Sequence, residues 1–213
     1  MFIFRILIAT IFAASATTVQ GAVLVSYNFN TTPNPTGGII SANATSFTPV
    51  GGAIQANASG RLRISQQVTD LTPPADPTLA IYTGFTLDSD PGCFLDLSQL
   101  SFGVRRQAAG RDATLIIRSS NDGFLSNIYS QHINDENSAV DQFINLSSFE
   151  STSSIEFRFY VVKSTSGGLI KRLELEGLSV DGVQIPEPAS IAVLGGLGLC
   201  FAGSSLSRRR KKA

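Results

Sequence analysis

The segment at residues 155–161 alternates strictly between apolar side chains and side chains that carry a polar group. The apolar set, which would share one face of a strand, is Ile155, Phe157, Phe159 and Val161. Glu156, Arg158 and Tyr160 would occupy the opposite face. A period of two over seven residues is typical of a β-strand with one buried face and one wetter face. A chain built from such segments must fold by pairing strands and packing their apolar faces together.

The same β-like character continues through the whole central part of the chain. Nine short runs are rich in β-branched and aromatic residues: 23–29, 62–68, 79–87, 100–106, 114–119, 140–146, 155–162, 169–176 and 178–183. Turn-forming residues separate the runs, for example Asp-Pro-Gly at 90–92 and Asn-Asp-Gly at 121–123. No sustained helical period interrupts this pattern. We predict an all-β domain over residues 22–185, folded as a two-sheet β-sandwich of the jelly-roll type.

Both ends of the chain have the composition of targeting segments and lie outside the predicted domain. Residues 1–21 combine Arg5, an apolar core at 6–14 and small residues before position 22, which is typical of a secretory signal peptide. Residues 189–206 are uncharged and mostly apolar, and at about 1.5 Å per residue they are just long enough for a transmembrane helix. Five cations follow this segment and would stay cytoplasmic: Arg208, Arg209, Arg210, Lys211 and Lys212.

A tripeptide of Pro186, Glu187 and Pro188 stands directly before the apolar segment. The order of tripeptide, apolar span and basic end over residues 186–213 resembles the PEP-CTERM sorting domain of exported bacterial proteins. The resemblance implies that an exosortase-type membrane protease reads the tripeptide and removes the helix and the basic tail. The secretion translocon and signal peptidase would act at the other end of the chain. A plain membrane anchor is the alternative that the residues themselves allow.

The resemblance also implies a route for the protein. The chain would be exported, held transiently in the inner membrane by its C-terminal helix, and then placed at the cell surface or in the extracellular matrix. Short patterns at residues 100–106, 117–124 and 157–160 resemble the jelly-roll ectodomain found upstream of this sorting tail. That second resemblance implies a fold and supplies no catalytic residue.

Removing the two terminal segments changes the charge balance. The whole chain has 16 basic and 16 acidic side chains, whereas residues 22–185 hold ten and fifteen, a net charge of about −5. An acidic domain is unsuited to nucleic-acid binding, which uses basic patches. Cys93 is the single cysteine of this region, so no internal disulfide is expected. Its place after the turn at 90–92 predicts burial at the start of a strand.

Candidate catalytic and metal-binding groups are sparse. His132 is the only histidine, and its polar neighbours favour a solvated loop over a catalytic triad. The several His or Cys ligands of a zinc site are missing from the sequence. Asp88, Asp90 and Asp96 could gather around calcium, but a plain turn at 90–92 is the simpler interpretation. We therefore predict no catalytic residue, no metal and no cofactor.

One pair of acids has the spacing that glycoside hydrolysis would need. Glu174 and Glu176 are two residues apart and would share one side of a strand. Charges on a solvated face are the simpler interpretation of such a pair.

A ligand, if one binds, is predicted to contact the polar face of residues 155–161. Glu156, Arg158 and Tyr160 together offer an acceptor, a planar donor and an aromatic ring. Arg118 would enlarge this patch if its strand lies in the same sheet. In the alternative interpretation the Arg158 stem covers apolar surface and its guanidinium pairs with Glu156 for structural reasons.

Three functional hypotheses follow from these features. The first is a noncatalytic surface or matrix protein that is processed at its Pro-Glu-Pro signal. The second is a carbohydrate-binding module of the exopolysaccharide layer, for which the absence of Trp and the presence of only four Tyr limit aromatic stacking. The third is a secreted hydrolase, which the single histidine makes unfavourable.

Overall fold

A computed structural model of the chain describes residues 21–40, 43–51, 53–57, 59–65, 81–106, 113–134, 138–163 and 172–187. Within these ranges the chain forms short and long β-strands and one 3-10 helix: β1 (Ala22–Tyr27), β2 (Thr48–Val50), β3 (Ala53–Asn57), β4 (Arg61–Ser65), β5 (Tyr82–Asp88), β6 (Cys93–Arg106), β7 (Ala113–Ser119), η2 (Ser120–Asp122), β8 (Tyr129–Ile133), β9 (Val140–Asn145), β10 (Ser154–Lys163) and β11 (Leu173–Pro186).

Several predictions concern residues outside these ranges. They are the signal peptide up to residue 20, Pro188, the apolar segment 189–206 and the basic residues 208–212. In the part of the chain that the structure describes, no helix has the length and apolar character needed to cross a membrane.

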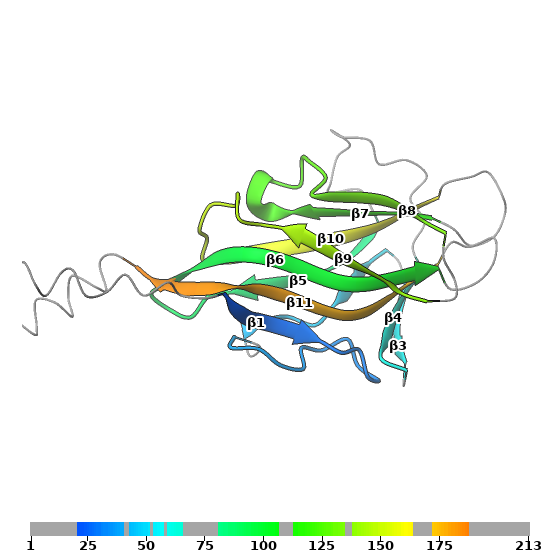
Figure 1. Cartoon of the computed structure of the whole chain (residues 1–213), viewed down its shortest axis with the longest axis horizontal. Helices are drawn as coiled ribbons and strands as arrows, with labels where there is room; N and C mark the ends of the chain where they lie inside the picture. Colours follow the sequence, from blue (N-terminus) through cyan, green and yellow to red (C-terminus); the bar gives the residue numbers. More distant parts are fainter. Residues whose placement is uncertain are drawn as a thin grey trace, which may run out of the picture.

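The strands form two antiparallel sheets that share one core. Sheet A has the order β3-β4-β11-β6-β9, with β1 also paired to β11, and sheet B has the order β2-β5-β10-β7-β8. Figure 1 shows the two longest strands, β6 and β11, running side by side along the molecule. The ring of Phe102 in sheet A lies 6.2 Å from the ring of Phe159 in sheet B, so the sheets face each other. The predicted all-β, jelly-roll-like sandwich is confirmed.

The core follows from the period-two pattern of the strands. In β10 the four alternating apolar side chains are at most 1% exposed, as the sequence predicts: Ile155, Phe157, Phe159 and Val161. An aromatic cluster surrounds them, in which the Phe47 ring lies 4.9 Å from Phe85, 5.1 Å from Tyr27 and 5.4 Å from Phe159. Such tilted and edge-on ring pairs add to the stabilisation from apolar burial.

The strand boundaries differ from the prediction at β11. Two strands, 169–176 and 178–183, were expected with a break at Gly177, but residues 173–186 form one strand. The ladder to β6 shifts register between Glu176 and Ser179, and Gly177 has a φ of 47° there. Gly177 therefore forms a β-bulge, which bends the strand without ending it. At this bulge the other neighbour of β11 changes from β4, which pairs with residues 173–176, to β1, which pairs with residues 178–182.

The remaining differences concern short or weakly patterned strands. The sequence did not predict β2, β3 and β8, and β6 begins at Cys93 rather than at residue 100. Thr48–Val50 and Tyr129–Ile133 are edge strands of sheet B, and Ala53–Asn57 is an edge strand of sheet A. Edge strands bury little apolar surface, so their sequences carry only a weak alternation.

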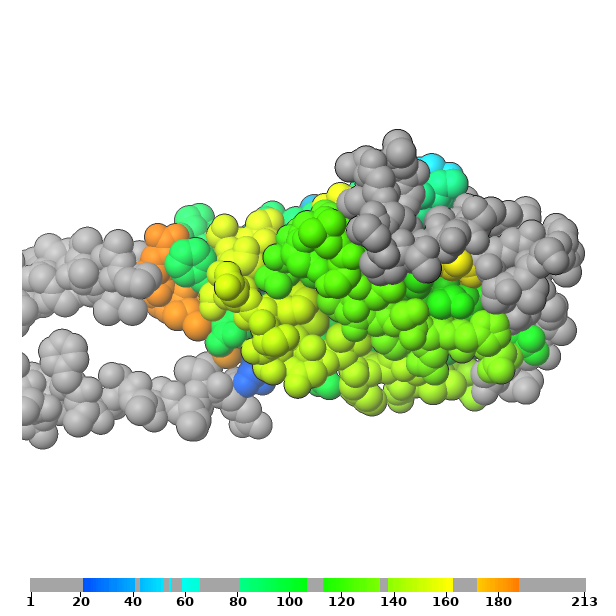
Figure 2. All heavy atoms as spheres, turned by 90° about the horizontal axis from the view of Figure 1, so that it is seen from above, coloured from blue at the N-terminus to red at the C-terminus, as the bar shows by residue number. Residues whose placement is uncertain are grey.

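The start of β1 and the end of β11 lie at the same end of the sandwich. Ala22 pairs with Gly182, and four residues later Pro186 pairs with Cys93. The backbone N–H of Glu187 donates a 2.8 Å hydrogen bond to the carbonyl oxygen of Gly92. Figure 2 shows the blue start of β1 and the orange end of β11 close together at this end. The first two residues of the Pro-Glu-Pro tripeptide therefore continue the sheet.

We expect Phe159→Ala to lower the free energy of unfolding by about 3–5 kcal/mol, because this fully buried ring contacts rings of both sheets. Denaturant unfolding followed by circular dichroism measures the loss. Phe143→Ala is the matched control: its ring is 68% exposed, and the change should stay within about 0.5 kcal/mol. Equal losses in the two variants would contradict the assignment of the core.

Candidate functional site

The predicted ligand face of β10 forms, but its charges are engaged. Arg158 donates from Nε to Glu156 Oε1 at 2.7 Å and from Nη2 to Glu156 Oε2 at 3.2 Å. The guanidinium carbon lies 3.6 Å from the ring centroid of Phe124 and 4.3 Å from that of Tyr82. Cation–π contacts on two rings and an ion pair hold Arg158 in place. This arrangement agrees with the alternative interpretation, in which Arg158 pairs with Glu156 to stabilise the sheet rather than to bind a ligand.

Tyr160 shares this face of β10 but is fully buried, so the prediction that its ring is an exposed contact surface is wrong. Arg118 lies on the neighbouring strand β7, directly opposite Arg158, and is also fully buried. Asn127 Oδ1 accepts from Arg118 Nε at 2.9 Å, and the Phe124 carbonyl oxygen accepts from Arg118 Nη1 at 3.1 Å. The segment that follows η2 is thus tied to Arg118, which lies 5.8 Å from the Tyr160 ring centroid.

The pKa shifts on this face follow from the same contacts. Burial lowers the pKa of Arg158, but its hydrogen bond and Coulomb attraction to Glu156 outweigh burial, and the net shift is upward. Burial raises the pKa of the Tyr160 hydroxyl, against the opposing effects of Arg158 and Arg118. Neither group is therefore suited to exchange a proton near neutral pH.

Glu174 and Glu176 of β11 are ion-paired rather than solvated. Glu174 is 3% exposed and accepts from Arg105 Nη2 at 2.8 Å and from Arg63 Nη2 at 3.3 Å. Glu176 pairs with Arg61. These are cross-strand partners, because Glu174 lies opposite Arg63 in β4 and opposite Arg105 in β6. The interpretation of this pair as solvated surface charge is corrected for Glu174, and arginines occupy the carboxylates that a hydrolase would need.

The other sequence candidates have structural roles. His132 lies in the edge strand β8 with an exposed side chain, not in a loop as predicted. Asp90 belongs to the predicted turn, and hydrogen bonds from Gln184 and from Asn43 lower the pKa of its carboxyl group. Cys93 begins β6 as expected, but it is only half-buried. Among the described residues, no three His, Cys, Asp or Glu side chains gather as a metal site would require.

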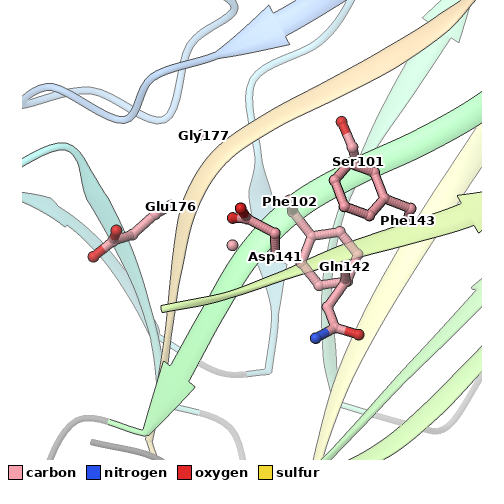
Figure 3. Close-up of a pocket in the computed structure, with 8 residues that line it drawn as sticks. Ser101, Phe102, Asp141, Gln142, Phe143, Glu176 and Gly177 are labelled. Atoms are coloured by element: carbon pink, nitrogen blue, oxygen red, sulfur yellow. The ribbon is translucent and has the colours of Figure 1, made fainter. Parts of the chain in front are cut away.

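An open hollow of about 310 Å³ lies on the outer face of sheet A. Its outward lining residues lie in two rows that cross β9, β6 and β11, and Ser179 borders the second row. In the first row Gly103 stands between Asp141 and Glu176, and in the second row Ser101 stands between Phe143 and Ser179. In Figure 3 the Asp141 side chain points from β9 towards β11, and Gln142 points the other way. We call this site the Phe143 hollow.

Two glycines create the depth of the Phe143 hollow. A Cβ at Gly103 would lie 3.2 Å from Ala139 Cβ and 3.4 Å from Glu176 Cβ, so any side chain there would fill the floor. Gly177 adds the bulge at the rim, and a Cβ there would meet no atom within 4 Å. Missing side chains at adjacent positions of two paired strands leave a concave patch on a surface that is otherwise covered.

The groups around the floor combine an apolar ring with several polar atoms. Phe143 is 68% exposed, and the hydroxyls of Ser101 and Ser179 lie 2.7 Å apart. Asp141 is exposed and has no hydrogen bond or ion pair to another described residue. Sequence reasoning missed this site, although Asp141 and Phe143 alternate within the predicted strand 140–146. The information that it lacked was which residues of β6 and β11 lie beside them.

Comparisons with known proteins give only distant matches. No protein-family model and no curated protein matches the chain. A point mutant of a family 29 carbohydrate-binding module complexed with mannohexaose is 13% identical, covers 76% of this chain and 93% of its own, and has a TM-score of 0.41. The CBM22-1 xylan-binding domain of Paenibacillus barcinonensis Xyn10C is 14% identical, covers 76% and 96%, and has a TM-score of 0.44. Likeness at this level carries no weight for the ligand of this chain.

We expect Glu174→Gln to lower the free energy of unfolding by about 3 kcal/mol, because two arginines lose their shared carboxylate in a buried position. This value is at the low end for a buried pair, since both arginines keep some contact with water. Thermal unfolding at low and high salt measures the effect. Glu176→Gln is the matched control: its carboxylate is 32% exposed, and about 0–1 kcal/mol is expected. A change of the same size in both variants would contradict the central role of Glu174.

Proposed function

We propose that the sandwich is a noncatalytic carbohydrate-binding domain that works outside the cell, and that the Phe143 hollow is its sugar site. The observation that carries this proposal is the exposed Phe143 ring beside a concave, polar floor. An open hollow with an apolar wall and a few convergent polar groups is a typical small-ligand site. The absence of a free acid pair on β11 supports binding without catalysis.

The chemistry of the hollow suits a sugar ring. A pyranose has an apolar face of C–H groups, which can lie against an aromatic ring, and hydroxyls around its edge. Asp141 offers a carboxylate acceptor, and Ser101 and Ser179 offer hydroxyls that can donate or accept. Phe143 and Asp141 belong to the edge strand β9, so one side of the hollow is open to a long polymer.

The second candidate function concerns sorting of the whole chain. We propose that the protein is exported and processed at Pro186, Glu187 and Pro188 by an exosortase-type protease of the inner membrane. The order of tripeptide, apolar segment and basic end in the sequence supports this proposal. The geometry that supports it is the position of Glu187 at the end of sheet A, at the same end of the sandwich as the start of β1. Ala22 and Glu187 lie at the same end of the domain, so a membrane attached there would leave the opposite end exposed.

Replacing Phe143 by Ala should weaken polysaccharide binding about tenfold, which corresponds to about 1.4 kcal/mol for a lost stacking contact. Affinity electrophoresis of the full chain, in a detergent without a sugar headgroup, measures retardation by hydroxyethyl cellulose, galactomannan, chitosan and the producing cells' own exopolysaccharide. Leu125→Ala removes another exposed apolar side chain far from the hollow and should leave retardation unchanged. No retardation by any polymer would overturn the proposal.

Replacing Glu187 by Ala in the producing cells should leave the protein in the inner membrane with its tail attached, if a protease reads the tripeptide. The parent chain should then have a mature mass that ends between residues 186 and 189. Glu150→Ala, an acidic change elsewhere in the domain, is the control and should be processed normally. A mature surface protein that retains residues 189–213 would instead support the plain anchor.

A further inference from the structure

A second hollow, of about 270 Å³, lies on the outer face of sheet B. Its floor is Gly84 in β5, which stands in register between Thr48 of β2 and Arg158 of β10. Tyr82, Thr86 and Glu156 line its sides. We call this site the Tyr82 hollow. It includes one residue of the ligand face that the sequence predicted, Glu156, while Arg158 stands opposite Gly84 and contacts the Tyr82 ring.

The Tyr82 hollow repeats the construction of the Phe143 hollow. A central glycine provides the floor in both, and at Gly84 a Cβ would lie 2.3 Å from the Phe157 carbonyl oxygen, so no other residue fits. An aromatic ring stands at one side in both. The Tyr82 ring is held by Arg158 at 4.3 Å and by Tyr160 at 5.8 Å. It is therefore fixed before any ligand arrives, which lowers the entropic cost of binding.

Polar groups are available beside this ring. The Thr86 hydroxyl has no hydrogen bond to another described residue, whereas its backbone N–H donates to Thr45 Oγ1 at 2.8 Å. Thr48 and Thr45 are exposed and add hydroxyls at the rim. A ring flanked by hydroxyls and one carboxylate is chemically close to the Phe143 hollow, with its serines and Asp141.

The two hollows open in opposite directions. Tyr82, Gly84 and Thr86 point outward from sheet B, because the alternate residues Phe85 and Leu87 are buried in the core. The Phe143 hollow lies on the outer face of the other sheet, and packed sheets are about 10 Å apart. Sugar units bound at the two sites would therefore be separated by the full thickness of the sandwich.

The charges at both hollows limit the class of polymer. Arg158 is paired with Glu156, and the arginines of sheet A are paired with Glu174 and Glu176. Asp141 adds a negative charge at the Phe143 hollow. Among the described residues that line the two hollows none is a cation, so a polyuronate would find no counter-charge in those linings, whereas neutral or amino sugars would meet acceptors and hydroxyls.

We propose that the Tyr82 hollow is a second carbohydrate site and that the protein cross-links two strands of a neutral or amino polysaccharide. This inference rests on the proposed function of the Phe143 hollow. Each site alone binds weakly, and two sites on one rigid sandwich join separate polymer strands into a network. Such a protein would stiffen an extracellular matrix without any covalent chemistry.

The test compares full-chain variants by retardation in polymer gels and by light scattering of dilute polymer. The probes are hydroxyethyl cellulose, galactomannan and chitosan, with alginate as the polyuronate. Phe143→Ala removes one site, and Tyr82→Ala or the nearly isosteric Thr86→Val weakens the other. Thr86→Val removes only a hydroxyl group, so it tests the same site if Tyr82→Ala fails to fold.

We expect the parent to be retarded and to raise scattering at least tenfold with one of the first three polymers and not with alginate. Each single-site variant should keep partial retardation but lose the rise in scattering, and Phe143→Ala with Thr86→Val should lose both. If Phe143→Ala by itself abolished retardation and Thr86→Val left it unchanged, the second site would be overturned. The proposed function of the Phe143 hollow would then still stand. No retardation of the parent by any polymer would overturn both.

Discussion

The antiparallel pairing of β6 with β11 is the interaction on which the rest of the structure depends. The ladder runs from Leu173 opposite Arg106 to Pro186 opposite Cys93. The other strands of sheet A are built onto this pair, since β9 adds to β6, β4 and β1 add to β11, and β3 adds to β4. The partners are about 70 to 90 residues apart in sequence, so closing the long loop between them is the costly step in forming sheet A. The ladder also places Glu174 opposite Arg105, its ion-pair partner, and Pro186 at the end of the sheet.

The Phe143 hollow is a direct consequence of how this ladder is built. The bulge at Gly177 shifts the register by one residue, so that Glu176 lies opposite Gly103 and Ser179 lies opposite Ser101. Without that shift, the outward side chains of β11 beyond the bulge would point into the core. The same bulge marks the change of neighbour from β4 to β1. A feature that the sandwich needs in order to join three strands thus also shapes the concave surface beside Phe143.

The sequence alone predicts what depends on local pattern and misses what depends on register. The alternation in β10 correctly placed Phe157 and Phe159 in the core, because period two is a property of one strand. Burial of Tyr160 was not predictable, since it depends on contacts from neighbouring strands rather than on the sequence pattern of β10 itself. Burial of Glu174 depends on Arg63 and Arg105, which are 111 and 69 residues away. The hollow was missed for the same reason, because its walls come from three strands.

Ion pairing within the strands decides which parts of the surface remain available for a ligand. Glu174 and Glu176 of β11 and Glu156 of β10 pair with arginines on their own or neighbouring strands, so these charges hold the sheets together and are not free for chemistry. Rings and hydroxyls remain beside two glycine floors, and they lie on opposite outer faces. Such a surface supports the proposed contact with a polymer, since the glutamates that a hydrolase would use are held by arginines. If both hollows bind sugars as proposed, a rigid sandwich with a site on each outer face would be suited to organise a matrix.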